Sequence, residues 1–202
     1  MFSWLVLHVI NYIIKHSYFF IKFINLKVCN YDLKIYSVCA RYPGSTHDAA
    51  IWSLSDDRRK LQQQFENGER NTWLLGDSGY PLEPWLITPF KNSLTEDQRQ
   101  FNYMHAKGRN PIERCNGVLK GVFRCLLGER KLRYQPKKVV KIINVCCALH
   151  NMRIFYKIPV SADDVFSECT NNFNVSDADD DEIGEHEFAV RIRNTIMRSL
   201  NN

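Results

Sequence analysis

Several features of common protein classes are missing from the sequence. Its 202 residues contain seven cysteines without a CxxC pair or a regular spacing, which argues against a zinc finger and against a disulfide framework. We therefore expect a reduced, intracellular protein. The length is sufficient for one domain with a hydrophobic core and an appendage.

Acidic residues are absent from the beginning of the chain. Residues 1–29 are rich in Phe, Ile and Tyr and contain no Asp or Glu. Lys15, His16 and Lys22 interrupt this run before the roughly 20 apolar residues that a membrane-spanning helix needs. A basic n-region and a small-residue cleavage site are also missing, so we expect neither a membrane anchor nor a signal peptide. We interpret residues 1–29 as an atypical apolar segment that is foreign to the fold.

The composition is that of a globular protein whose charge is unevenly distributed. Hydrophobic residues make up 45% and charged residues 24% of the chain. The net charge is +5, yet ten acids fall within residues 163–187, so residues 1–162 hold 24 Lys and Arg against 12 Asp and Glu. A basic body with an acidic tail favours a polyanionic partner such as nucleic acid. A solvated surface tuned for solubility is the alternative.

Short apolar runs alternate with helical patterns along residues 30–158, which predicts an α/β domain. We expect N-caps at Ser45 or Thr46 and at Thr95. Residues 159–202 are predicted to form an acidic flexible tail with a short amphipathic helix near its end. Strands are predicted over residues 31–42, 73–75 and 85–90, and helices over 45–68, 94–106, 110–127 and 136–156.

The segment 110–127 has the clearest helical pattern. Asn110 is predicted to cap this helix and Pro111 to occupy its first position. Apolar side chains recur on one face, whereas Glu113, Lys120 and Arg124 project from the opposite face. Lys120 and Arg124 are placed to contact a phosphate backbone, or else belong to an ordinary solvated helix face.

Asp48, Asp77 and Glu113 are candidates for chemistry, although each also has a structural explanation. Asp48 falls in the first turn of a helix, where a negative charge is favourable. Asp77 follows a buried apolar run, where a turn aspartate is common, and Glu113 fits a capping box. As a set they are more specific, because clustered carboxylates repel one another and a divalent cation relieves that repulsion. Such a cation, for which Mg²⁺ is suited, supplies what hydrolysis of a phosphodiester needs.

His150 with Cys147, and the basic cluster at residues 131–138, each have a structural and a functional interpretation. His150 and Cys147 share one face of the predicted helix 136–156, and a packed core histidine is favoured there over a metal ligand. The cluster KLRYQPKK, residues 131–138, is suited to nuclear import or to phosphate contact, and a solvated loop explains it as well.

Several motifs in the sequence resemble those of one family. They are YPGSTHDAAIW, WLLGDSGYPL, WLITPF, NPIERCNGVLKGVFRCL and CCALHNM. In this order and at these spacings they are similar to the Harbinger transposase-derived nucleases of the PIF/Harbinger group. The resemblance spans about residues 30–158 and implies a nuclease domain with an RNase H-like fold and a DDE-type site.

The resemblance also implies roles for particular residues. Asp77 resembles the family's second catalytic carboxylate and Glu113 the third, while Asp48 matches the aspartate of the PGSTHD motif and is implied as a metal ligand. The implied cofactor is a divalent cation, Mg²⁺ or Mn²⁺. DNA is the implied substrate, a Myb-like DNA-binding protein an implied partner, and the nucleus, with the cytoplasm as an alternative, the implied location.

One part of the family pattern is missing. The family's first catalytic aspartate lies in a strand with an IDGTH-like motif, upstream of the region that matches Tyr31, and no Asp or Glu precedes Asp32 here. We therefore expect an N-terminally truncated fold whose first strand is missing and whose sheet edge is exposed. The leading hypothesis is a metal-dependent nuclease. The alternatives are a catalytically inactive DNA- or protein-binding remnant and a truncated gene model of a complete nuclease.

Overall fold

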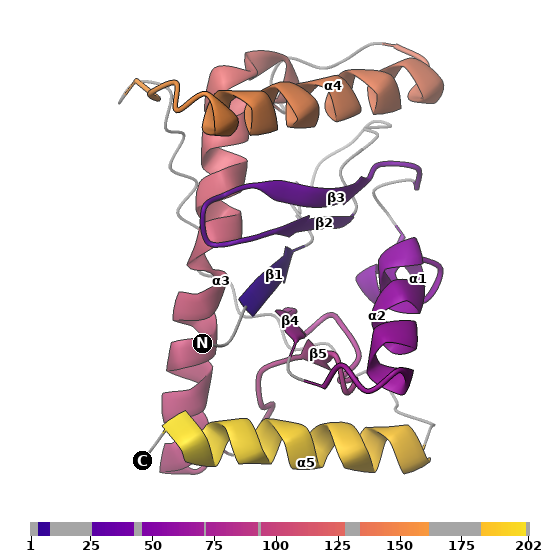
Figure 1. Cartoon of the computed structure of the whole chain (residues 1–202), viewed down its shortest axis with the longest axis vertical. Coiled ribbons are helices and arrows are strands. Elements are labelled where there is room, and N and C mark those ends of the chain that lie inside the picture. Colours follow the sequence, from indigo (N-terminus) through magenta and orange to yellow (C-terminus); the bar gives the residue numbers. More distant parts are fainter. Residues whose placement is uncertain are drawn as a thin grey trace. The chain divides into compact units, whose positions relative to one another are not determined.

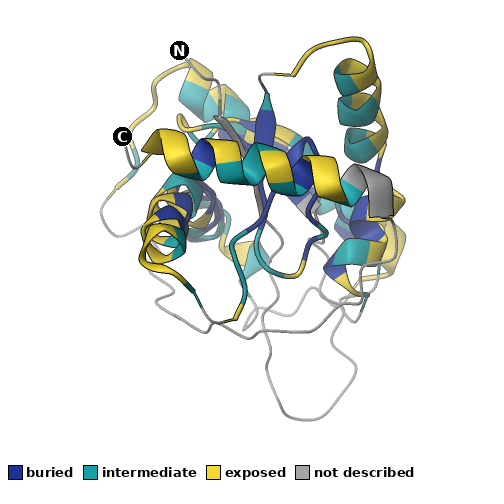
Figure 2. Ribbon diagram, turned by 90° about the horizontal axis from the view of Figure 1, so that it is seen from below, coloured by how far each residue is buried: buried dark blue, intermediate teal, exposed yellow. Residues whose placement is uncertain are grey.

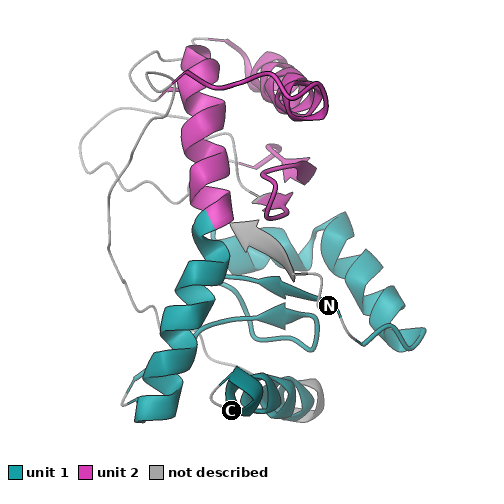
Figure 3. Cartoon of the chain, turned by 60° about the vertical axis from the view of Figure 1, so that its left-hand side comes forward, with its two compact units in different colours: residues 1–7, 47–110, 172–202 teal, residues 8–46, 111–171 magenta. Residues whose placement is uncertain are grey.

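Figure 1 shows the computed structural model, which describes residues 4–8, 26–42, 46–70, 72–92, 94–127, 134–161 and 183–200. The chain divides into two compact units, coloured differently in Figure 3, and we describe each by itself. The first unit comprises residues 1–7, 47–110 and 172–202, and the second comprises residues 8–46 and 111–171.

Short parallel strands form the sheet of the first unit. Strand β1 (Trp4–His8) pairs with β4 (Trp73–Leu75), and β4 pairs with β5 (Leu86–Ile87). All residues of β4 and β5 are buried, as is usual for parallel strands. The strands predicted over residues 73–75 and 85–90 are confirmed, and the second is shorter than predicted. The α/β class is confirmed with them, while the RNase H-like topology stays a prediction.

The beginning of the chain differs from the prediction. A sheet without its first strand is predicted, with residues 1–29 foreign to the fold, but Trp4–His8 form β1 beside β4. The apolar run WLVLH is a suitable strand sequence, and pairing with it satisfies backbone groups at an edge of β4 that would otherwise be open. Residues 26–29 of the same segment form a strand of the second unit. Residues 9–25 lie outside the described residues.

Two helices, α1 (Asp48–Ser53) and α2 (Asp56–Glu66), replace the single helix predicted over residues 45–68. The hydroxyl of Ser55 accepts a hydrogen bond from the Arg58 N–H at 3.1 Å, so Ser55 caps a new helix rather than continuing the first. The predicted cap at Thr46 is wrong, because His47 precedes α1 and makes no side-chain cap. The other predicted cap, Ser45, lies outside the described residues.

Helix α3 (Glu96–Val122) replaces the two helices predicted over residues 94–106 and 110–127, and it contributes residues to both units. Its cap is confirmed, because Thr95 Oγ1 accepts from the Gln98 N–H at 3.3 Å and Gln98 Oε1 accepts from the Thr95 N–H at 3.0 Å. The predicted cap at Asn110 is wrong, since the helix continues through Asn110 and Pro111. Pro111 and Ile112 are buried, so packing of the apolar face outweighs the local preference of proline for a helix start.

Helix α5 (Ile183–Leu200) confirms the amphipathic helix predicted near the end of the chain. Ala189 and Ile196 are buried in a cluster that includes Trp73, and Figure 2 shows buried and exposed positions along the helix. The guanidinium of Arg193 lies 4.0 Å from the ring centroid of Phe90. It also donates to the carbonyls of Thr88 at 3.3 Å and Pro89 at 3.4 Å. These contacts fix α5 within the first unit.

An antiparallel hairpin and helix α4 (Pro136–Phe155) form much of the second unit. Strand β2 (Leu26–Cys29) pairs with β3 (Ile35–Cys39), and α4 packs against β3. The side chain of Asn151 joins the two elements, because its Oδ1 accepts from the Ile35 N–H at 2.9 Å and its Nδ2 donates to the Ile35 carbonyl at 2.7 Å. The helix predicted over residues 136–156 is confirmed, and the strand predicted over 31–42 is shorter than predicted.

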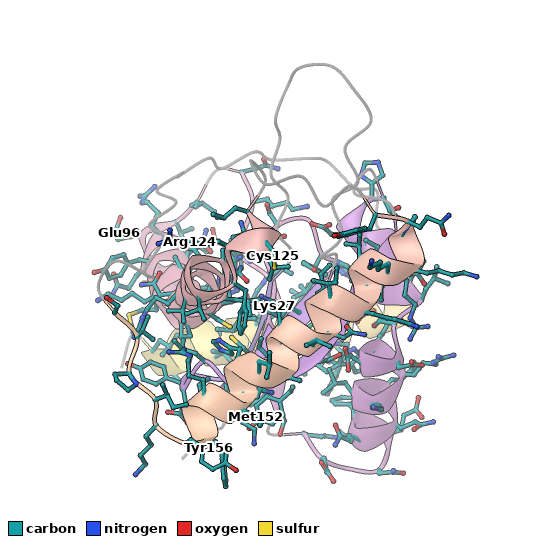
Figure 4. All side chains as sticks on the ribbon, turned by 90° about the horizontal axis from the view of Figure 1, so that it is seen from above. Lys27, Glu96, Arg124, Cys125, Met152 and Tyr156 are labelled. Carbon is teal, nitrogen blue, oxygen red and sulfur yellow. The ribbon has the colours of Figure 1, made fainter. Side chains whose placement is uncertain are left out.

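Polar side chains are buried in the core of the second unit. His150 is fully buried and its Nε2 donates to the carbonyl of Leu33 at 2.9 Å, which confirms the interpretation as a packed core histidine. Lys27, labelled in Figure 4, is buried as well, and its ammonium donates to Asn116 Oδ1 at 2.5 Å. Burial lowers the pKa of Lys27. Nothing in the sequence pattern marks this lysine as a core residue.

His105 on α3 is a buried titratable group of the first unit. Its Nε2 donates to the carbonyl of Ile87 on β5 at 3.1 Å. Burial lowers the pKa of His105 from 6.5 to about 4, and the bond to Ile87 opposes part of this shift. The folded chain therefore keeps the imidazole neutral at pH values where the unfolded chain has it charged.

We expect the free energy of unfolding to fall as the pH is lowered from about 6.5 to about 4. The unfolded chain binds a proton at His105 in this window and the folded chain does not, which removes about 2 to 3 kcal/mol. Urea unfolding at a series of pH values measures the loss. His105→Gln keeps a donor for Ile87 and should flatten this part of the curve; an unchanged slope would contradict the assignment.

Candidate metal-binding site of the first unit

Asp77 directly follows β4, at the carboxyl end of the strand. Its Oδ1 accepts from the Gly79 N–H at 2.9 Å, and its backbone carbonyl accepts from the Tyr80 N–H at 3.2 Å. The turn conformation predicted for this aspartate is thereby confirmed. Its other carboxylate oxygen, Oδ2, lies 3.7 Å from Nη2 of Arg109 on α3. The turn and the arginine together fix the orientation of the carboxylate.

Asp48 is the first residue of α1, and only 6% of its surface is exposed. A methyl group added at Gly79 would lie 3.1 Å from Asp77 Oδ1 and 3.5 Å from Asp48 Oδ2. Both carboxylates therefore border one small space, which is open because residue 79 has no side chain. The structure thus brings together two of the three predicted acidic residues.

Charge and burial distinguish this space from an ordinary turn. Two carboxylates close together repel one another, and the guanidinium of Arg109 offsets part of this repulsion. Tyr80 is buried beside them. Burial chiefly, and then the charges of Asp48 and Asp77, raise the pKa of Tyr80 well above its usual value, so it remains a neutral phenol. The first unit therefore concentrates negative charge at the end of β4.

A third carboxylate, Glu83, holds α1 and α2 against the segment that follows β4. Glu83 is buried, and its side chain accepts from Trp52 Nε1 at 2.7 Å and from Arg58 Nε at 2.6 Å. Its backbone exchanges two 3.0 Å hydrogen bonds with Leu86 of β5. Because Trp52 lies one helical turn after Asp48, this network sets where Asp48 lies relative to the turn of Asp77.

The remaining predicted site residues belong to the second unit. Glu113 is exposed within α3, so its predicted position in a capping box is wrong. Lys120 is half-buried in the last turn of α3. Arg124 is exposed in a 3₁₀ turn, η1 (Arg124–Leu126), because α3 ends at Val122, and it does not share a helical face with Glu113 as predicted. Their functional roles stay predictions from the resemblance.

The two carboxylates fit the requirements of a Mg²⁺ site. Mg²⁺ prefers oxygen ligands and is usually held by one or two protein carboxylates together with waters and substrate oxygens. Within the ranges that the structure describes, no group of three His, Cys, Asp or Glu side chains could hold a metal ion. In the first unit, Asp48 and Asp77 would supply the protein ligands because both border the space beside Gly79.

Comparisons with known proteins identify the family. A family model described as DDE superfamily endonuclease matches residues 7–151. The chain belongs to this family. The endonuclease domain is 36% identical over 137 residues to proteins of Mus musculus and Homo sapiens named "Putative nuclease HARBI1". It is 30% identical over 136 residues to a protein of Arabidopsis thaliana named "Protein ALP1-like".

The coverage of these matches is partial. The alignment includes 67% of this chain and 38% of each HARBI1 protein, and 61% of this chain and 33% of the Arabidopsis thaliana protein. The chain therefore spans well under half the length of these relatives. No solved structure matches it. Among the described helices of this DDE endonuclease domain, none is both long and apolar enough to cross a membrane.

Three residues around the carboxylates were not predicted from the sequence: Tyr80, Glu83 and Arg109. Glu83 carried the clearest available signal, because it is a single acid within the otherwise apolar stretch PLEPWLI. An acid in a buried run requires donors, and these come from Trp52 and Arg58 on preceding helices. Arg109 had no comparable signal, since it is one of several basic residues on a polar stretch of α3.

We expect Glu83→Gln to lower the free energy of unfolding by about 2 to 3 kcal/mol. The substituted amide removes the charge that Arg58 pairs with and cannot accept both hydrogen bonds. Thermal or urea unfolding of the full chain measures the loss. Glu66→Gln, at an exposed position of α2, is the matched control and should change stability by less than about 0.5 kcal/mol. Equal losses in the two variants would show that the hydrogen bonds of Glu83 with Trp52 and Arg58 have no energetic role.

Proposed function

We propose that this DDE endonuclease domain is part of a divalent-metal-dependent nuclease that hydrolyses DNA phosphodiester bonds. The observation that carries the proposal is the convergence of Asp48 and Asp77 on the space beside Gly79. Family membership and the printed names of the HARBI1 relatives support the nuclease class. Mg²⁺ is the proposed cation, with Mn²⁺ as the alternative.

Each residue of the site has a proposed task. Asp48 and Asp77 would hold the cation, which when bound polarises a phosphoryl oxygen and lowers the pKa of a water molecule. The Gly79 N–H keeps Asp77 in one orientation, and Arg109 supplies guanidinium donors beside Asp77 for a phosphate oxygen. Glu113 is proposed as a further ligand from the resemblance alone.

DNA contact and location belong to the same proposal. Lys120 and Arg124 are proposed to contact the DNA backbone. A DNA substrate favours a nuclear location, and a Myb-like DNA-binding partner would supply target recognition, as the resemblance implies. Each of these statements depends on DNA being the substrate.

One observation favours a second candidate function, a catalytically inactive DNA- or protein-binding remnant. Strand β1, the parallel neighbour of β4, has the sequence WLVLH and therefore contains no Asp or Glu. A carboxylate on that strand would complete the acidic set that the family resemblance implies. A remnant would bind DNA without cleaving it.

Plasmid cleavage distinguishes the two candidates. In the presence of Mg²⁺ or Mn²⁺ the full chain should nick supercoiled DNA, and Asp77→Asn or Asp48→Asn should reduce the rate by at least about a hundredfold. Asp97→Asn, at an exposed position of α3, is the matched control and should leave the rate unchanged. A chain that binds DNA but shows no metal-dependent cleavage would exclude the nuclease and favour the remnant.

A further inference from the structure

A basic pocket lies at the start of α4, in the second unit. It has a volume of about 550 Å³ and is lined by Tyr134, Gln135, Lys137, Lys138 and Lys141. Figure 4 looks onto α4 and labels Met152 and Tyr156 toward its C-terminal end, whereas the pocket is at the other end of the helix. The three lysines are exposed, and none of the lining residues that the structure describes is acidic.

The lysines lie where local helix energetics disfavour them. The N-terminal end of a helix carries a partial positive charge, so the first turn usually contains Asp or Glu. The first turn of α4 contains no acid, and Gln135 provides no side-chain cap. Lys137 and Lys138 therefore add positive charge to an end that is already positive. Arrangements that oppose a local stability rule are expected at functional sites.

Neighbouring groups do little to neutralise this charge. None of the three lysines forms an ion pair with another residue that the structure describes. The ammonium of Lys138 lies 4.1 Å from the ring centroid of Tyr134, a contact that orients the lysine without cancelling its charge. Along residues 124–141 the sequence has seven Lys or Arg and a single acid, Glu129.

We propose that this basic pocket binds the phosphate backbone of a nucleic acid strand. Lys137 and Lys141 are one helical turn apart and so present two charges side by side, which suits the repeated phosphates of a strand. Tyr134 is half exposed and offers an aromatic edge beside them. Every lining residue among those that the structure describes is exposed rather than buried, which argues against a small discrete anion. The inference rests on the proposed function only in taking DNA as the nucleic acid.

Equilibrium binding of a short fluorescein-labelled DNA duplex tests the inference. Fluorescence anisotropy is measured on the full chain in EDTA, over a series of salt concentrations, so that cleavage is not involved. The variant carrying Lys137→Ala, Lys138→Ala and Lys141→Ala should bind at least about tenfold more weakly. The slope of its plot of log K against log salt should be smaller in magnitude by about 2 to 3, because each lost phosphate contact reduces that slope by about 0.9.

A matched variant distinguishes the effect of the pocket lysines on DNA binding from the effect of net charge alone. Lys34→Ala, Lys60→Ala and Lys107→Ala remove the same charge at three other exposed positions and should change the salt slope by less than about 1. If the two triple variants lose equal affinity, the pocket is not a binding site. If wild-type chain binds no DNA, the inference also fails.

Charge reversal keeps the test independent of folding. Lys137→Glu places an acid at the helix start, so the midpoint of thermal unfolding should stay the same or rise while DNA affinity falls. A fall in both would indicate unfolding instead and would count against the inference. Cleavage gives a separate outcome: a chain that never cleaves but binds through this pocket refutes the proposed nuclease activity and leaves the pocket supported.

Discussion

The candidate site depends most on the hydrogen bonds that the buried carboxylate of Glu83 accepts from Trp52 and Arg58. A buried carboxylate is unfavourable unless its oxygens accept strong hydrogen bonds, and here Trp52 and Arg58 supply them from two helices. The backbone of the same residue is paired with Leu86 of β5. One residue therefore ties α1 and α2 to the strands of the first unit, and Asp48 reaches the end of β4 as a consequence.

The turn at Asp77 shows that a structural role and a functional role need not exclude each other. The Gly79 N–H donates to one carboxylate oxygen, which is the ordinary role of an aspartate in a turn. The same bond holds the carboxylate beside the space that Asp48 also borders. Gly79 serves both roles, because its N–H makes the turn bond and its missing side chain leaves the space open. A carboxylate that is held rigidly in this way is what a metal site requires.

The sequence predicts correctly those helices, strands and caps for which the local sequence pattern and the tertiary packing favour the same structure. β4 follows from an apolar run, α4 from helical periodicity, and the Thr95 cap from the preference of threonine for the N-cap position. The failures occurred where packing overrides a local signal. Asn110 and Pro111 resemble a helix start, yet burial of the neighbouring apolar face carries α3 through them.

The pairing of segments that lie far apart along the chain could not be predicted from the sequence. Because residues 1–29 are apolar and free of acids, the sequence predicts that they are foreign to the fold, and only the ladder of β1 with β4 shows that Trp4–His8 belong to the sheet. Within the site, motif resemblance identified Asp48 and Asp77, whereas Arg109 and Tyr80 became visible only through contacts across the first unit. A buried Lys27 in the second unit is a further case, because burial of a lysine depends on an acceptor such as Asn116 that lies far along the chain.

Binding of Mn²⁺ to the full chain shows whether Asp48 and Asp77 share a cation site. Electron paramagnetic resonance of free Mn²⁺ gives the affinity without any need for activity. The wild-type chain should bind the ion, and Asp48→Asn, Asp77→Asn and Gly79→Ala should each weaken binding by about tenfold or more. The Gly79 variant is the sharpest of these, because its methyl group would enter the space beside both carboxylates without removing either of them. If the wild-type chain binds no Mn²⁺, or if the Gly79→Ala chain binds it as tightly as wild type, Asp48 and Asp77 do not share a cation site beside Gly79.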